Sequence, residues 1–113
     1  IVKKLVLLEF WFPYCAGCVQ ATPILNDIQN KYKDKGLSIY GIEFTEKPAE
    51  ALLEYSKKQQ VEIPTLYNGK KISKEYGVYA APTFFLIDEN LEIVYTSTGL
   101  HKQELVNEIE KRL

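Results

Sequence analysis

Residues 9–18 read EFWFPYCAGC and hold both cysteines of the chain, Cys15 and Cys18, directly after an apolar run. Two residues at this spacing share one face of a helix, so their sulfurs can bond to each other. A cysteine at a helix N-terminus lies beside free N–H groups and the positive end of the helix dipole, which stabilise a thiolate. The stretch therefore predicts a redox pair, with Cys15 as the nucleophile and Cys18 as the resolving thiol.

Apolar runs and helical periodicities alternate on both sides of this stretch. Strands are expected over residues 5–11, 37–44, 83–87 and 92–96. Helices are expected over residues 15–33, 49–60, 72–76 and 102–113. Pro23 is expected to kink the first helix and Gly36 to end it. The pattern predicts an α/β fold in which a β-α-β half precedes a β-β-α half closed by a hairpin.

Length, composition and charge exclude several classes of protein. The chain has 113 residues, 46% of them hydrophobic and 26% charged, and a net charge of -1. This predicts a single domain over residues 1–113 that does not bind nucleic acid. We also expect a monomer, although composition does not decide the oligomeric state. No segment approaches the length of an apolar membrane span. The chain begins at Ile1 without a methionine, so we expect a trimmed start and take no evidence from the missing leader.

Other uses of the two cysteines fit less well. Structural zinc usually takes four Cys or His ligands, and the chain adds only His101 to the pair, so no metal site is expected. Haem attachment needs a histidine after the second cysteine, where Val19 stands. A disulfide that closes so short a loop restricts the unfolded chain little, so a purely structural role is disfavoured. No cofactor is expected.

The order of several residues along the chain resembles the thioredoxin superfamily. Glu9 stands six positions before the first cysteine, Tyr14 directly precedes it, and Pro23 follows the second cysteine by five positions. Ala81 and Pro82 then lead into the hairpin, where this superfamily places a cis-proline. The resemblance covers nearly the whole chain and implies a central mixed β-sheet flanked by helices.

Within the superfamily the chain looks most like the TlpA and ResA branch of extracytoplasmic thiol-disulfide oxidoreductases. Residues 49–66 resemble that branch's extra helix and strand, inserted between the two halves of the fold, and residues 72–78 resemble its approach to the proline. One departure is Ala21, which stands where many members carry a glutamate. The acidic residue Glu9 is instead like that of protein disulfide isomerases.

The resemblance implies a site around the cysteines. Glu9 matches the buried carboxylate that relays a proton to or from the second cysteine, and burial should raise its pKa. Pro82 is favoured over the locally similar Pro64 as the cis-proline, because it directly precedes the hairpin. Ala81 would then pair through its main chain with an extended substrate.

Aromatic residues surround the motif. Trp11, Phe12 and Tyr14 form an apolar collar around Cys15 that suits an extended polypeptide. For Trp11, packing in the core is an equal alternative. Tyr14 is expected to be exposed.

The sequence and the resemblance together predict a thiol-disulfide oxidoreductase acting on protein thiols or disulfides outside the cytoplasm, served by an upstream redox partner. Ala16 and Gly17 bring no charge to stabilise a thiolate, which favours a reductant. Maturation of c-type cytochromes is one role that the resemblance implies. The alternative functions are an oxidase or isomerase of secreted proteins and a binding or chaperone module without turnover. The alternative location is the cytoplasm.

Overall fold

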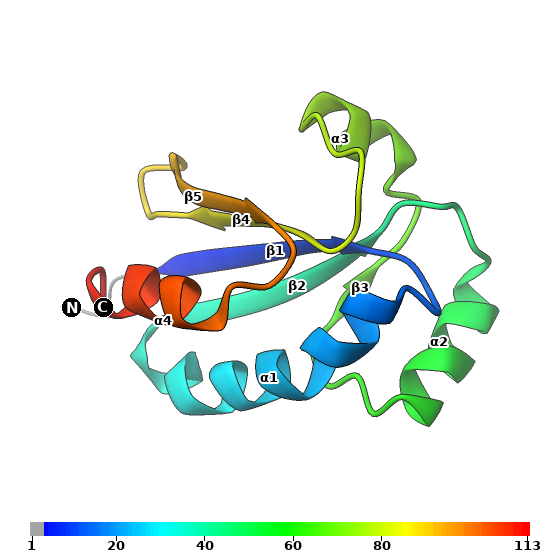
Figure 1. Ribbon diagram of the computed structural model, residues 1–113, viewed down its shortest axis with the longest axis horizontal. Coiled ribbons are helices and arrows are strands. Elements are labelled where there is room, and N and C mark those ends of the chain that lie inside the picture. The colour runs from blue at the N-terminus through cyan, green and yellow to red at the C-terminus, as the bar shows by residue number, and fades with distance from the viewer. Residues whose placement is uncertain (1–3) are drawn as a thin grey trace.

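A single five-stranded sheet forms the centre of the computed structural model, which describes residues 4–113 (Figure 1). Ile1, on which the expectation of a trimmed start rests, lies outside the described residues. The strands are β1 Leu5–Trp11, β2 Leu37–Glu43, β3 Thr65–Leu66, β4 Thr83–Ile87 and β5 Ile93–Thr98. The helices are α1 Ala16–Tyr32, α2 Ala49–Lys58, α3 Lys70–Glu75 and α4 Lys102–Glu110, and a 3-10 turn, Lys33–Lys35, follows α1.

Strand β1 is the middle strand of the order β3-β2-β1-β4-β5. It runs parallel to β2 and antiparallel to β4, so the sheet is mixed, as predicted. Its sequence LVLLEFW is apolar at every position but Glu9, and all of its residues except Val6 are buried. A strand covered on both faces lacks the alternation of apolar and polar residues, which is why this run reads as continuous.

Helices cover both faces of the sheet. Helices α1 and α4 pack on one face, and α3 lies on the other (Figure 1). Leu7 and Leu25 belong to the core under α1 and α4, while Phe10 and Phe85 belong to the core near α3. Helix α2 lies beyond the end of β1, beside the start of α1 (Figure 1). The predicted insert of a helix and a strand between the two halves of the fold is confirmed.

The strand of the insert is short, since within residues 61–66 only Thr65–Leu66 pair with β2. The N–H of Val61 instead donates to Ser56 O at 2.9 Å, at the end of α2. The N–H of Glu62 donates to Asn26 Oδ1 at 3.1 Å, on α1. In this register the N–H of Glu62 would face β2 in a longer strand, and Asn26 takes that donor instead.

Several element ends differ from the predictions by a few residues. Cys15 is the N-cap of α1, not its first residue, and α2 and α4 end at Lys58 and Glu110. The predicted helix 72–76 begins earlier, at Lys70, and β5 extends to Thr98 because its end pairs with Thr83. Gly36 ends the first helical segment as predicted, with φ 112°.

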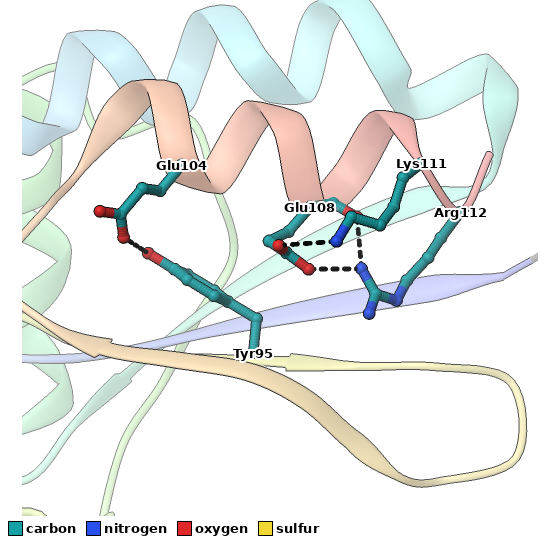
Figure 2. A network of polar contacts seen from close by, with 5 residues as sticks. All are labelled: Tyr95, Glu104, Glu108, Lys111 and Arg112. Atoms are coloured by element: carbon teal, nitrogen blue, oxygen red, sulfur yellow. Dashed lines mark hydrogen bonds and ion pairs between the residues drawn. The ribbon is translucent and has the colours of Figure 1, made fainter.

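Polar contacts tie α4 to the sheet and close its last turn (Figure 2). The hydroxyl of Tyr95, on β5, donates to Glu104 at 3.3 Å. Glu108 pairs with Arg112 at 2.7 Å and with Lys111 at 3.0 Å. The hydrogen bond from Arg112, then that from Lys111, lowers the pKa of Glu108.

The first half of β2 extends beyond the short β3, and a side chain from α1 satisfies its open edge. Gln29 Nε2 donates to Leu37 O at 2.8 Å, and Ile39 N–H donates to Gln29 Oε1 at 2.7 Å. A single amide thus gives β2 both kinds of hydrogen bond that a neighbouring strand would supply.

No helix among residues 4–113 is long and apolar enough to cross a membrane.

Candidate active site

Cys15 and Cys18 form a disulfide where β1 leads into α1, and their Cα atoms are 5.2 Å apart. Cys15 is the N-cap of α1, and its Sγ accepts a hydrogen bond from Cys18 N–H at 3.3 Å. Cys15 is 7% exposed and Cys18 3%. The helix begins here because an extended N-cap residue whose side chain accepts an N–H satisfies one of the helix's free donors.

Tyr14 directly precedes the pair and is 78% exposed, which confirms the expectation for this side chain. Its backbone φ is 67°, in the left-handed region that non-glycine residues seldom occupy. The N–H of Tyr14 donates to the hydroxyl of Tyr55, on α2, at 3.2 Å. The ring of Tyr14 contacts that of Tyr55 edge-on, with centroids 5.0 Å apart.

Pro82 lies against the motif, between the two cysteines. A Cβ placed on Gly17 would lie 3.0 Å from Pro82 Cδ, so the proline ring sits directly over that glycine. The Ala81–Pro82 peptide bond is cis, as predicted for Pro82, and Pro64 is not preceded by a cis bond. Ala81 packs against the buried cluster that contains both cysteines.

Glu9 lies in the core on β1, where it is 5% exposed. Side chains alternate along a strand, so Glu9 shares the α1 face of the sheet with Leu7 and Trp11. Its Oε2 has no hydrogen-bond partner among the described residues. Burial disfavours the charged form and raises the pKa of Glu9 from its ordinary 4.5 to about 8. The predicted direction of the pKa shift is confirmed.

Trp11 lies in the core and not in an exposed collar. It is 4% exposed and stacks on Tyr55 with ring centroids 5.7 Å apart. It belongs to the same buried cluster as both cysteines. Burial leaves its side chain almost no surface to offer a substrate, so its place in the structure is that of support beneath the motif.

The sequence prediction missed Tyr55 and Gly17. Leu52 and Tyr55 are the two buried residues of α2, three positions apart, and both belong to the cluster with the cysteines. The spacing indicates a buried face of α2 but does not indicate what that face covers. The sequence around Gly17 shows only that the residue is uncharged, because nothing local to it reveals the proline ring above.

Among residues 4–113, no group of three or more His, Cys, Asp or Glu side chains is placed to hold a metal ion. A disulfide at a helix N-terminus, a proline ring against it and a buried acid on the adjoining strand together define a thioredoxin-like dithiol/disulfide site.

The chain belongs to the Redoxin family, whose model matches residues 2–113. It is 32% identical over 111 residues to the thiol-disulfide oxidoreductase ResA of Bacillus thuringiensis subsp. konkukian, a match that covers 97% of the chain. It is 30% identical over 104 residues to the thioredoxin-like protein YneN of Bacillus subtilis, a match that covers 88% of the chain. The chain spans 64% of the length of the first of these relatives and 61% of the second.

A solved structure shares the fold. The thioredoxin domain of a thiol-disulfide oxidoreductase from Bacteroides vulgatus superposes with a TM-score of 0.83 and 28% identity, over 96% of this chain and 78% of that one. The predicted resemblance to the thioredoxin superfamily and to ResA-like proteins is confirmed, and so is the thioredoxin-like fold. The Cys15–Cys18 disulfide has a sequence separation of three, the spacing of a redox pair.

Proposed function

We propose that the chain works as one thiol-disulfide oxidoreductase domain that reduces disulfides in protein substrates. The observation that carries this proposal is the Cys15–Cys18 disulfide at the N-terminus of α1, with Pro82 packed against Gly17 between the cysteines. The relatives named thiol-disulfide oxidoreductases support the reaction class.

The exchange proceeds in two steps from the reduced protein. The Cys15 thiolate attacks one sulfur of the substrate disulfide and forms a mixed disulfide, and the other substrate sulfur leaves as a thiolate that takes up a proton. The Cys18 thiolate then attacks Cys15 Sγ, the mixed disulfide breaks, and the second substrate thiol is released. The substrate gains two electrons and the protein is left with the Cys15–Cys18 disulfide. A dithiol partner then reduces the protein by the reverse steps.

Glu9 serves as the proton acceptor and donor for Cys18 in this proposal. A pKa of about 8 lies close to the ordinary pKa of a thiol, about 8.5, so a proton moves between the two groups with little change in free energy. The absence of a competing hydrogen bond to Oε2 among the described residues leaves that atom free to hold the proton.

The substrate is an extended polypeptide that lies across the motif. The main chain of Ala81 pairs with it, and the exposed ring of Tyr14 supplies apolar contact. Beside Tyr14, a groove of about 350 Å³ opens between the active-site turn and α2, lined by Pro13, Tyr55 and Lys47 among others. A larger groove of about 390 Å³ lies between α2 and β3 and is lined by no residue of the active-site turn, so we give it no part in the reaction.

The remaining assignments follow the relatives and the motif. The residues between the cysteines are uncharged, which favours a reductant. We place the protein outside the cytoplasm, as a monomer that receives electrons from an upstream dithiol partner and has a role such as the maturation of c-type cytochromes. The competing assignment is an oxidase or isomerase of secreted proteins.

The deciding experiment is the reduction potential of the Cys15–Cys18 pair, equilibrated against glutathione or dithiothreitol. Trp11 reports the state by fluorescence, since it belongs to the same buried cluster as both cysteines. A midpoint near about -270 mV, as in thioredoxin, is the expected result for a reductant. A midpoint near about -120 mV, as in DsbA, would overturn the reductant in favour of an oxidase. A pair that does not cycle at all would leave only a binding module.

A further inference from the structure

We infer that Tyr55, on the inserted helix α2, is a positioning residue for the redox pair and acts through Tyr14. Its hydroxyl oxygen accepts the N–H of Tyr14, and its ring meets both Tyr14 and Trp11. Tyr14 is bonded directly to Cys15, so Tyr55 holds the peptide that leads into the nucleophile. The inference rests on the proposed thiol-disulfide exchange.

The backbone conformation of Tyr14 needs stabilising contacts from outside the turn. At φ 67°, a residue with a side chain is less stable than in an extended or helical conformation. The backbone hydrogen bond within the turn, from the N–H of Cys15 to the carbonyl oxygen of Phe12, is long, with 3.4 Å between N and O. The hydrogen bond to Tyr55 and the edge-on ring contact therefore supply stabilisation that the turn lacks.

Tyr55 is well suited to fix another residue because its own position is fixed. It is 6% exposed, and it packs with Leu52 and Trp11 in the cluster that contains both cysteines. The connection into α2 is held by Glu43, whose buried carboxylate accepts the N–H groups of Thr45 at 2.8 Å and Lys47 at 3.0 Å. The hydroxyl of Tyr55 thus lies at a defined point relative to β1.

The connection that leaves α2 is fixed as well. Asn26 Nδ2 donates to Gln60 O at 2.8 Å, and Asn26 Oδ1 accepts the N–H of Glu62 at 3.1 Å. Since Asn26 lies on α1, these bonds tie the far end of α2 to the helix that carries the cysteines. Helix α2 is therefore braced at both ends, with Tyr55 between them.

The chemical consequence falls on Cys15. Its sulfur is the N-cap of α1 and accepts the N–H of Cys18 only while the preceding turn keeps its shape. The helix N-terminus favours the negative charge of a thiolate at this point. Without the hydrogen bond to Tyr55, the turn would keep the Cys15 sulfur at the N-cap position for less of the time. Cys15 would then be less reactive at neutral pH.

The test compares Tyr55→Phe with a matched tyrosine variant. Both are made in a Cys18→Ser background, where Cys15 is the only thiol, and the rate of Cys15 alkylation by iodoacetamide is followed against pH. Y55F removes the hydroxyl and keeps the ring. Y32F is the control, because Tyr32 is also buried and donates its hydroxyl to Glu110 at 2.5 Å, in the core under α1 and α4.

The expected result is a profile for Y55F shifted to higher pH, with alkylation at pH 7 slowed by a factor of about two to five, while Y32F matches the parent. A Y55F profile that coincides with the parent's would overturn the inference. An equal shift in Y32F would also overturn it, since the cause would then be a general loosening of the fold.

Amide hydrogen exchange measures the hydrogen bond itself. Tyr14 N–H is expected to exchange about tenfold faster in Y55F than in the parent, and no faster in Y32F. Unchanged exchange at Tyr14 would show that the hydroxyl does not hold this peptide. Neither readout needs a substrate, so a protein that fails to reduce protein disulfides would disprove the proposed function and leave these comparisons of Cys15 and Tyr14 readable.

Discussion

The ring of Pro82 sits on Gly17, so close that a Cβ at residue 17 would lie 3.0 Å from Pro82 Cδ. Two segments far apart in the sequence thereby meet in the middle of the Cys-x-x-Cys motif. Ala81, the neighbour of Pro82, packs against the cluster that contains both cysteines, and the close contact favours glycine at position 17.

Gly17→Ala is expected to lower stability by about 1 kcal/mol. Alanine is normally the better helix residue by about 1 kcal/mol, but here the added methyl group must displace a rigid proline ring, and such overpacking costs about 1–3 kcal/mol. Urea unfolding of the oxidised protein measures the difference. Ala16→Gly, at an exposed position of the same turn, gives the scale for helix propensity alone. If G17A gained as much stability as A16G lost, the Pro82 ring would move aside at no cost, which would contradict the prediction.

Glu9 is expected to make stability fall as the pH rises from about 4.5 to about 8. Below 4.5 the carboxyl is protonated in both states. Between the two values the unfolded chain releases the proton and the folded protein keeps it, so each pH unit favours unfolding by about 1.4 kcal/mol. Above about 8 both states are ionised and the loss is complete.

Glu9→Gln should remove this decline, so that the free energy of unfolding of the oxidised protein changes by about 3 kcal/mol less between pH 5 and pH 8 than in the parent. The cysteines do not titrate in the disulfide. Glu54→Gln, at an exposed side chain on α2, is the control and should keep the decline. Parallel curves for E9Q and the parent would place the Glu9 pKa near its ordinary value.

The two cysteines should give different variants. Cys15→Ser is expected to abolish reduction of a protein disulfide, because no thiolate remains at the helix N-terminus. Cys18→Ser should stop at the mixed disulfide, since the resolving thiol is gone, and should accumulate a covalent complex visible by nonreducing electrophoresis. Trapping by C15S in place of C18S would reverse the assigned roles.

Gly41→Ala is expected to displace the indole of Trp11, which packs beneath the Cys-x-x-Cys motif. A Cβ at Gly41 would lie 2.7 Å from Trp11 Nε1, so the indole must move, at a cost of about 1–3 kcal/mol. Trp11 is the sole tryptophan, so its emission spectrum should change with the loss of stability. Gly77→Ala is the comparison, because Gly77 has φ +72° but open space around it. It should lose stability with no change in emission, and a silent G41A spectrum would contradict the contact.

Glu43→Gln should loosen the entry to α2 and cost about 1–3 kcal/mol. The buried carboxylate accepts bonds from Thr45 N–H, the Thr45 hydroxyl and Lys47 N–H, and an amide nitrogen cannot accept. Thermal unfolding measures the loss. Glu46→Gln makes the same change at an exposed site in the same loop and should be neutral. Equal stability of E43Q and E46Q would show that the loop does not depend on these bonds.

Local patterns predicted what depends on local chemistry. Both ends of β1 and of β4 were predicted correctly, because continuous apolar runs between turn residues leave little choice. The spacing of the cysteine pair and the burial of Glu9 also follow from local sequence, whereas the cis bond before Pro82 was implied by the resemblance to the superfamily.

What the sequence did not predict depends on contacts between distant residues. The strand of the insert is only two residues long, and Asn26, far earlier in the chain, accepts the N–H of Glu62 just before it. Tyr55 lies under the motif because α2 folds back onto β1, and no spacing along the chain encodes that. Trp11 was equally compatible with core and surface until its neighbour Gly41 was placed.

The amide of Gln29 also affects how other polypeptides can bind to the edge of β2. An exposed strand edge is a template on which other chains can add strands and aggregate. By occupying the donor and acceptor positions of Leu37 and Ile39, this one side chain denies the edge of β2 to other polypeptides. This part of the sheet edge therefore offers no free main-chain groups on which another chain could add a strand.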